Sequence, residues 1–177
     1  MKNGYLFLIQ ALTALSLVIA IGCSKNDPTS SSVPDPEGTV TANISESTHI
    51  EIVPQNGGND YGFIGWATPN NISIHGGYSN GYASSTVTYM SICDMGASKG
   101  LGNITKIPQA GFSTPSWDIN NAVACEVGHG YMIKFLCYIN STPVDSGYVR
   151  LYVVESIPNT SGDIMGAQVK YQYPFNP

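Results

Sequence analysis

An alternation of apolar and polar residues with a period of two is the feature that most constrains the fold of this chain. It begins near Thr39 and recurs in segments rich in β-branched and aromatic residues, such as SSTVTYMSIC (84–93) and VRLYVV (149–154). Alternation of this kind is typical of strands with one buried face. Clusters of Gly, Asn and Pro separate the segments, and after residue 23 we find no convincing apolar stripe of helical period.

The expected strands lie at 39–45, 49–53, 61–67, 71–75, 84–93, 122–127, 131–139, 147–155 and 164–173. The chain is therefore predicted to be all-β, forming a single antiparallel-rich sandwich or a partly closed barrel.

The segment 121–140 predicts a β-hairpin with His129 at its tip. Gly128 and Gly130 flank this residue, and glycine can adopt the positive φ angles of a hairpin turn without steric strain. Pairing across the hairpin would place Cys125 opposite Ile133. The residues expected on its core face are Val123, Cys125, Val127, Tyr131, Ile133, Phe135 and Cys137.

The first 22 residues have the features of an export signal, with a basic Lys2 followed by an apolar run over 5–21. The run ends in Ala20-Ile21-Gly22-Cys23, which resembles the lipobox of bacterial lipoproteins. In those proteins the cysteine receives diacylglycerol and becomes the mature N-terminus, so Cys23 is the predicted lipidation site. The acyl chains would hold the protein on a membrane. The alternative is an ordinary signal peptide with an unmodified Cys23.

The chain is expected to have three parts: a lipoprotein signal peptide (1–22), a lipidated N-terminus with a flexible tether (23–37) and a β domain (38–177). The tether is rich in Ser, Pro and Asp and nearly devoid of apolar residues. Its first residues, Ser24 to Asp27, partly resemble an export signal of Bacteroidetes lipoproteins. They predict the bacterial outer membrane, with the surface side favoured over the periplasmic side.

The charge balance argues against nucleic acid as a partner. The net charge is −5, and removal of the signal peptide with its Lys2 makes it −6. Nucleic-acid binding needs basic patches. Charged residues make up only 11% of the chain, against about 25% in typical domains. Neutral polar groups must therefore supply much of the solubility, as in many secreted β domains.

Lipidation of Cys23 would leave an odd number of cysteines for disulfide formation. Cys125 and Cys137 are offset by four residues in the expected hairpin, roughly 13 Å apart, which is too far for a disulfide. Cys93 could pair with either of them, and the alternative is three buried thiols.

Sequences that could support catalysis or metal binding are sparse. Residues 96–100 match the G-x-S-x-G motif of serine hydrolases, with Ser98 as nucleophile and Asp118 and His129 following in the appropriate order. That motif requires a strand followed by a helix, and the sequence after Ser98 lacks a helical period, so a turn is favoured. The three histidines show no compact metal-binding spacing, and we expect no metal and no cofactor.

Exposed aromatic residues are the remaining candidates for ligand contact. Trp66, Tyr82 and Trp117 occur among Gly, Asn and Ser in loop-like sequence, a combination suited to stacking on sugar rings and to adaptable recognition. The alternative, which we favour, is that these side chains close the ends of the sandwich core.

Several segments together resemble an uncharacterised family of Bacteroidetes lipoproteins. They are PDPEGTVTANI, KGLGNITKIP, VGHGYMIKF, YVRLYVVESI and IMGAQVKYQYPF, which span about residues 34–177. The resemblance implies a secreted, anchored β domain without assigned catalytic residues.

The expected function is therefore that of a lipid-anchored envelope protein with a non-catalytic β domain, and the membrane would be its partner through Cys23. A glycan or another envelope protein is a further possible partner. The alternatives are a glycan- or ligand-binding module that uses the exposed aromatics and, less favoured, a small hydrolase that uses Ser98.

Overall fold

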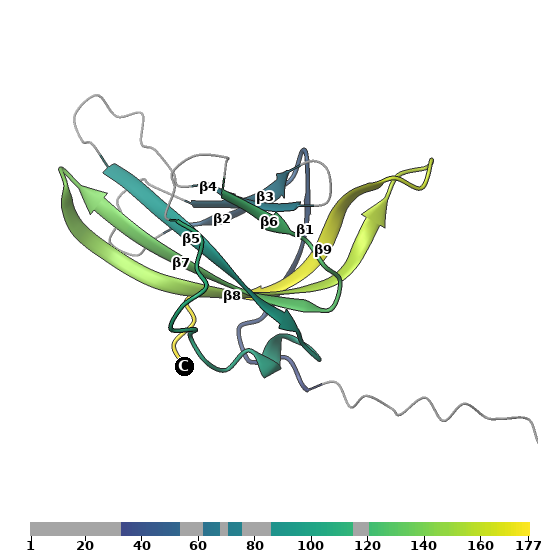
Figure 1. Cartoon of the computed structure of the whole chain (residues 1–177), viewed down its shortest axis with the longest axis horizontal. Coiled ribbons are helices and arrows are strands. Elements are labelled where there is room, and N and C mark those ends of the chain that lie inside the picture. Colours follow the sequence, from purple (N-terminus) through teal and green to yellow (C-terminus); the bar gives the residue numbers. More distant parts are fainter. Residues whose placement is uncertain (1–32, 54–61, 68–70, 76–85, 115–120) are drawn as a thin grey trace, which may run out of the picture. The chain divides into compact units, whose positions relative to one another are not determined.

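The computed structural model contains two antiparallel β-sheets that pack against each other (Figure 1). It describes residues 33–53, 62–67, 71–75, 86–114 and 121–177, and leaves out the side chains at 62–63, 66–67, 71–75, 86–87 and 121. The strands are β1 (Val40–Ser45), β2 (Ile50–Ile52), β3 (Gly62–Ala67), β4 (Asn71–His75), β5 (Thr86–Ala97), β6 (Asn121–Ala124), β7 (His129–Ile139), β8 (Thr142–Pro158) and β9 (Ile164–Gln172). One 3₁₀ helix, η1 (Leu101–Asn103), follows β5. The predicted all-β class is confirmed.

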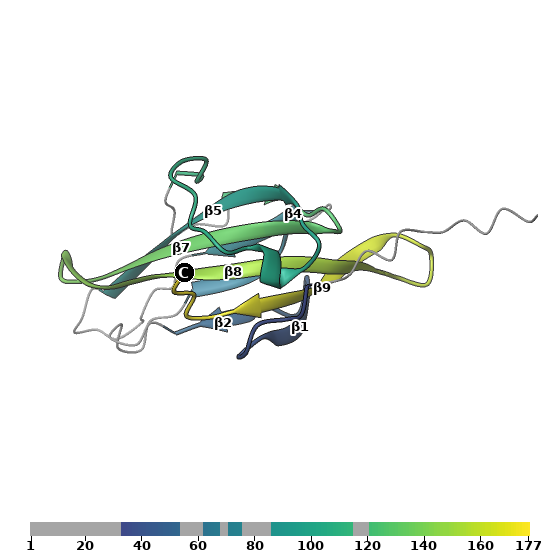
Figure 2. The same ribbon diagram turned by 90° about the horizontal axis from the view of Figure 1, so that it is seen from below.

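The larger sheet has the strand order β1-β9-β8-β7-β5, and the smaller sheet has the order β2-β3-β4-β6. Neither order closes on itself among the described strands, so the sandwich and not the barrel is the architecture. Figure 2 shows the long strands β7, β8 and β9 running side by side through the larger sheet. No helix in the described part of the chain is long and apolar enough to cross a membrane.

The main core lies between the two sheets. On β7 the buried residues Tyr131, Ile133 and Phe135 alternate along the strand, and they pack in one cluster with Ile50 and Ile64 of the smaller sheet. We call this side of the larger sheet the inner face. The alternation in the sequence thus records one buried face of each strand, as the period of two predicts.

The predicted hairpin between 122–127 and 131–139 is wrong. β6 pairs with β4 in the smaller sheet, whereas β7 pairs with β5 and β8 in the larger one. The chain crosses between the sheets at 125–128, and Tyr131 stabilises the crossing. Its hydroxyl donates to the Ala124 carbonyl at 2.7 Å and accepts from the Glu126 amide at 2.9 Å.

Two further details of the predicted hairpin change with this crossing. Val127 is 55% exposed and does not lie on the core face. His129 is not at a tip, because it begins β7 and pairs with Ala97 of β5. Gly128 does adopt a positive φ of 83°, but Gly130 is needed for space. A Cβ there would lie 2.6 Å from Cδ1 of Ile104.

The opposite side of the larger sheet, its outer face, has a smaller apolar cluster of its own. Residues 98–113, which we call the outer-face segment, lie over it together with the C-terminal Phe175. The buried members of this cluster are Cys93, Leu101, Ile104, Met132 and Phe175. Ser113 also protects the free edge of β5, because its amide donates to the Ile92 carbonyl and its hydroxyl accepts from the Ile92 amide.

The predicted tether ends earlier than residue 37. Thr39 donates from its amide and its hydroxyl to the Pro36 carbonyl, and Gln172 of β9 donates to the Glu37 carbonyl. Lys170 of β9 forms an ion pair with Asp35. Residues 33–37 therefore belong to the folded unit, which begins at Ser32.

The predicted pairing of Cys93 with Cys125 or Cys137 is also corrected. In the described part of the chain no disulfide joins these three residues, and each is a thiol. Cys93 lies in the outer-face cluster, whereas Cys125 packs against the main core. Cys137 shares the parity of Ile133 and Phe135 on β7. The sheet itself therefore separates Cys93 from both predicted partners.

Candidate functional site

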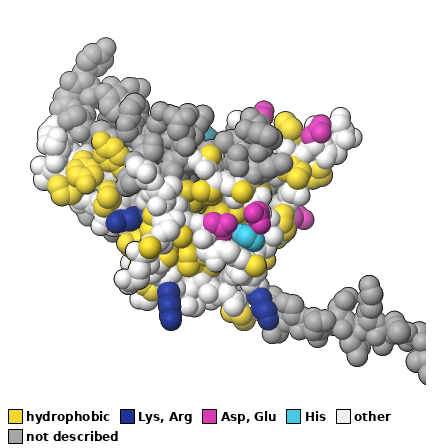
Figure 3. All heavy atoms as spheres, viewed as in Figure 1, with side chains coloured by type: hydrophobic (Ala, Val, Ile, Leu, Met, Phe, Trp, Pro, Cys, Tyr) yellow, Lys and Arg dark blue, Asp and Glu magenta, His cyan; other side chains and the backbone are white. Residues whose placement is uncertain are grey.

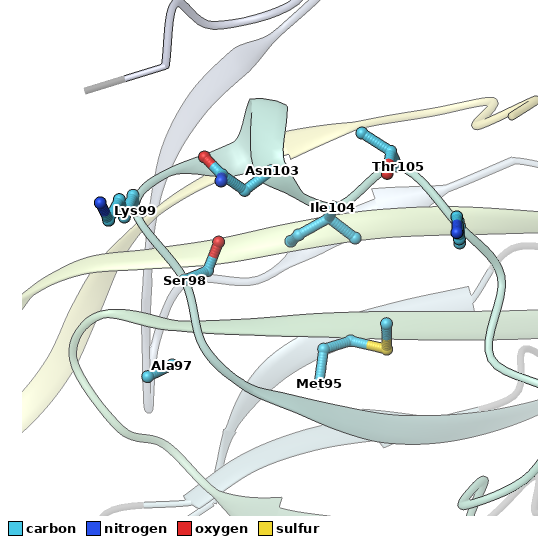
Figure 4. A pocket seen from close by; sticks show the side chains of 8 residues that line it. Met95, Ala97, Ser98, Lys99, Asn103, Ile104 and Thr105 are labelled. Atoms are coloured by element: carbon cyan, nitrogen blue, oxygen red, sulfur yellow. The ribbon is translucent and has the colours of Figure 1, made fainter. Parts of the chain in front are cut away.

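A surface pocket of about 470 Å³ lies where β5 ends and the outer-face segment begins (Figure 4). It combines an apolar wall with hydroxyl, amide and amine groups. Its lining residues are Met95, Ala97, Ser98, Lys99, Asn103, Ile104, Thr105 and Lys106. In Figure 4 the side chains of Met95, from β5, and Ile104, from the outer-face segment, approach the same space.

A β-bulge at the end of β5 contributes one side of this pocket. The register of β5 with β7 shifts between Asp94 and Gly96, which leaves Met95 as the extra residue. Gly96 adopts a positive φ of 76°, and its amide donates to Oδ1 of Asp94 at 2.7 Å. The bulge therefore places the exposed Met95 at the pocket.

Arg150 of β8 holds the Ile104 wall of the pocket in place, although it does not line the pocket itself. Its side chain is only 7% exposed, and Nη1 donates to the Ile104 carbonyl at 2.7 Å. Nε donates to Oε1 of Gln172, and the guanidinium lies 4.5 Å from the centre of the Phe175 ring. Desolvation lowers the pKa of Arg150 from its ordinary value. A buried cation thus holds the backbone of a pocket residue in place.

The pocket is basic although the chain as a whole is acidic. Lys99 and Lys106 line it, and none of the described acidic residues does. None of the described acidic side chains forms an ion pair with either lysine. On the face seen in Figure 3, acidic side chains gather beside a histidine, and the Lys and Arg side chains lie apart from them. On this face the acidic and the basic side chains are therefore separated.

A second polar cluster surrounds His129. Its Nδ1 lies 3.2 Å from both carboxylate oxygens of Asp94, and its Nε2 lies 3.1 Å from Oε2 of Glu126. Both ring nitrogens of His129 therefore face carboxylate oxygens. This cluster joins the bulge of β5 to the crossing between β6 and β7.

Among the described residues, Ser98 and His129 contact other groups and not each other. The Ser98 hydroxyl donates to the Gly100 carbonyl at 2.9 Å, and the ring nitrogens of His129 face Asp94 and Glu126. Only the three-residue η1 follows the motif, as the expected turn requires. Asp118, the third residue of the hypothesis, lies outside the described residues.

The remaining predicted site residues lie largely outside the described part of the chain. Cys23, Tyr82 and Trp117 are not described. Trp66 lies in β3, where its backbone is in register with Ile72, and its side chain is not described. Lipidation of Cys23 and ligand contact by the aromatics therefore stay predictions. No group of three or more His, Cys, Asp or Glu residues suited to a metal ion occurs within the described ranges.

The basic pocket is the feature that sequence reasoning missed, although one signal was present. Residues 95–117 contain no Asp or Glu and include both Lys99 and Lys106, a local excess of positive charge in an acidic chain. The role of Arg150 had no comparable signal, since it occurs within an ordinary strand pattern.

Comparisons of this chain with family models, curated proteins and solved structures find no match.

Proposed function

We propose that this protein is a lipid-anchored component of the bacterial outer membrane whose β domain has a non-catalytic role. The observation that carries the proposal is Cys23 at the end of an apolar segment, preceded by Ala20-Ile21-Gly22. Acylation at this position would make Cys23 the first residue of the mature chain.

The folded unit gives this proposal structural support. It begins at Ser32, only nine positions beyond Cys23, and residues 33–37 contact β9 through Asp35 and Glu37. The chain thus passes from the predicted acylation site into a domain that holds its first residues firmly. The bond from the Ser98 hydroxyl to the Gly100 carbonyl favours a structural role for that serine.

Membrane partitioning of the full-length protein tests this proposal. Wild-type protein produced in a bacterial host is expected in the membrane fraction, and Cys23→Ala is expected to lose acylation. An inhibitor of the lipoprotein signal peptidase should cause the uncleaved precursor to accumulate. Cys93→Ala is the matched control, because Cys93 is a thiol within the folded domain.

Retention of a mature, signal-free Cys23→Ala protein in the membrane fraction would contradict the proposal.

A further inference from the structure

The N-terminal segment of the domain packs beside the basic pocket. Gly102 of η1 has no room for a side chain, because a Cβ there would lie 2.7 Å from the Pro34 carbonyl oxygen and 2.8 Å from Cγ1 of Val33. η1 lies between the two lysines of the pocket in sequence, and its Asn103 is one of the lining residues. The chain therefore enters the folded domain against the same helix that carries part of the pocket.

Chain length limits how far this entry point can lie from Cys23. Nine residues, 24–32, separate Cys23 from Val33. Whatever their conformation, the ten steps from Cys23 to Val33 span at most about 36 Å, which does not exceed the diameter of a domain of this size. If Cys23 carries lipid, the end of the domain that bears Val33, η1 and the pocket stays close to the membrane surface.

The pocket has the charge that an anionic membrane surface attracts. Lys99 and Lys106 are exposed and form no ion pair with any described acidic residue. The other basic groups of the folded part near the entry point are engaged: Lys170 with Asp35, and Arg150 with the Ile104 carbonyl and Gln172. Lysines next to a negatively charged leaflet add measurably to membrane affinity.

We infer that this pocket binds the phosphate group of an anionic lipid in the membrane to which Cys23 is anchored. Lys99 and Lys106 supply the positive charge, and Ser98, Asn103 and Thr105 line the same space with hydroxyl and amide groups. The inference rests on the proposed function, because the anchor brings the pocket to the lipid surface. Tethering raises the local concentration of headgroups, so two lysines suffice for a contact that would be weak between free partners.

Labelling of lysines on vesicles tests this inference. The acylated mature protein is inserted into vesicles of neutral phosphatidylcholine, or of phosphatidylcholine with about 30% phosphatidylglycerol, whose negative charge attracts basic segments. An amine-reactive reagent is applied, and the labelling rate of each lysine is measured by mass spectrometry. Lys134, in the middle of β7, is the internal control.

We expect labelling of Lys99 and Lys106 to fall about threefold or more on the anionic vesicles, and that of Lys134 to stay unchanged. The protection should weaken as salt increases, because contacts between exposed charges are screened. Equal rates on both kinds of vesicle, or an equal fall at Lys134, would overturn the inference.

A third arm separates lipid phosphate from soluble phosphate. Inorganic phosphate is added to protein on neutral vesicles at ionic strength matched with chloride. Protection of both lysines by this free phosphate, without protection by phosphatidylglycerol, would overturn the assignment to a lipid.

Failure of the proposed lipid anchor can be distinguished from failure of the proposed phosphate contact. If the exported protein carries no acyl group, the proposed function fails. The mature chain can then be coupled through the Cys23 thiol to a maleimide-bearing phospholipid, and the same labelling ratio still decides whether the pocket contacts the anionic surface.

Discussion

The two faces of the larger sheet achieve burial in different ways. The inner face packs against a second sheet, and its alternating residues, such as Ile133 and Phe135, form a continuous apolar cluster. The outer face packs against an irregular segment, and the buried Arg150 lies beside Met132 and Phe175 of its apolar cluster. One sheet thus carries a regular apolar core on its inner face and an irregular layer with a polar pocket on its outer face.

The largest expected loss of stability comes from truncating a buried side chain, and two neighbouring residues of β7 allow the two faces to be compared. Ile133 and Met132 are both fully buried, on the inner and outer face respectively. Ile133→Ala should lower the free energy of unfolding by about 2–5 kcal/mol. Met132→Ala should lower it by about 1–3 kcal/mol, because the irregular cover can collapse into the vacated space.

Equilibrium denaturation in urea measures both values. A loss for Met132→Ala that equals or exceeds the loss for Ile133→Ala would show that the outer face is as rigidly packed as the inner one.

Removal of the buried arginine should destabilise the outer face alone. Arg150→Met leaves the Ile104 carbonyl without its donor and removes the contact with Phe175. We expect a loss of about 1–3 kcal/mol, typical of a buried polar group without a partner. Hydrogen exchange should quicken in residues 101–107 and stay unchanged in the middle of β7. Lys134→Gln is the control, and equally fast exchange in β7 would contradict a local role for Arg150.

High pH should lower the stability of the domain, because the Cys125 thiol beside the main core ionises. Burial raises the pKa of this thiol from its ordinary value of 9.0 to about 12. Because the pKa is raised in the folded state, its contribution to stability is complete below about pH 9 and is lost as the pH rises towards 12. Burial also raises the pKa of Tyr131, which acts in the same direction.

Thermal unfolding between about pH 8 and 11 measures this dependence. Cys125→Ala should flatten the decline in Tm without abolishing it, since Tyr131 remains. Identical slopes for wild type and variant would refute a linkage to Cys125.

The smallest expected effect concerns the cluster around His129, at the edge between the two faces. His129→Gln removes the contacts with Asp94 and Glu126, whose side chains are partly exposed. The expected loss is about 0.2–1 kcal/mol, and it should shrink further in high salt. Double-mutant cycles with Asp94→Asn measure the coupling, and a value well above this range would assign the cluster a greater structural role.

The strands could be predicted from the sequence because apolar residues alternate with polar ones along each strand that has one buried face. The predicted segment 71–75 coincides with β4, and the other strands overlap their predictions. Strand pairing could not be predicted in the same way. The period of two in segments 122–127 and 131–139 does not reveal that these segments belong to different sheets. The bonds of the Tyr131 hydroxyl that stabilise this crossing depend on three-dimensional proximity.

The lining residues of the pocket all lie within 95–106. The pocket was nevertheless not predicted, because the contacts that hold this segment in place come from distant parts of the chain. Arg150 meets Ile104 across 46 positions in the chain, and Pro34 meets Gly102. Neither contact leaves a local pattern in the sequence. The position of Lys99 and Lys106 near the N-terminal entry of the domain follows only from the packing of Gly102 against Val33 and Pro34.

The chemical state of Cys23 tests directly whether the protein is anchored to the membrane by a lipid. Mass spectrometry of the N-terminal peptide from membrane-associated protein should show Cys23 as the first residue, carrying a diacylglyceryl group. A peptide that begins elsewhere, or a Cys23 with an unmodified thiol, would contradict the account.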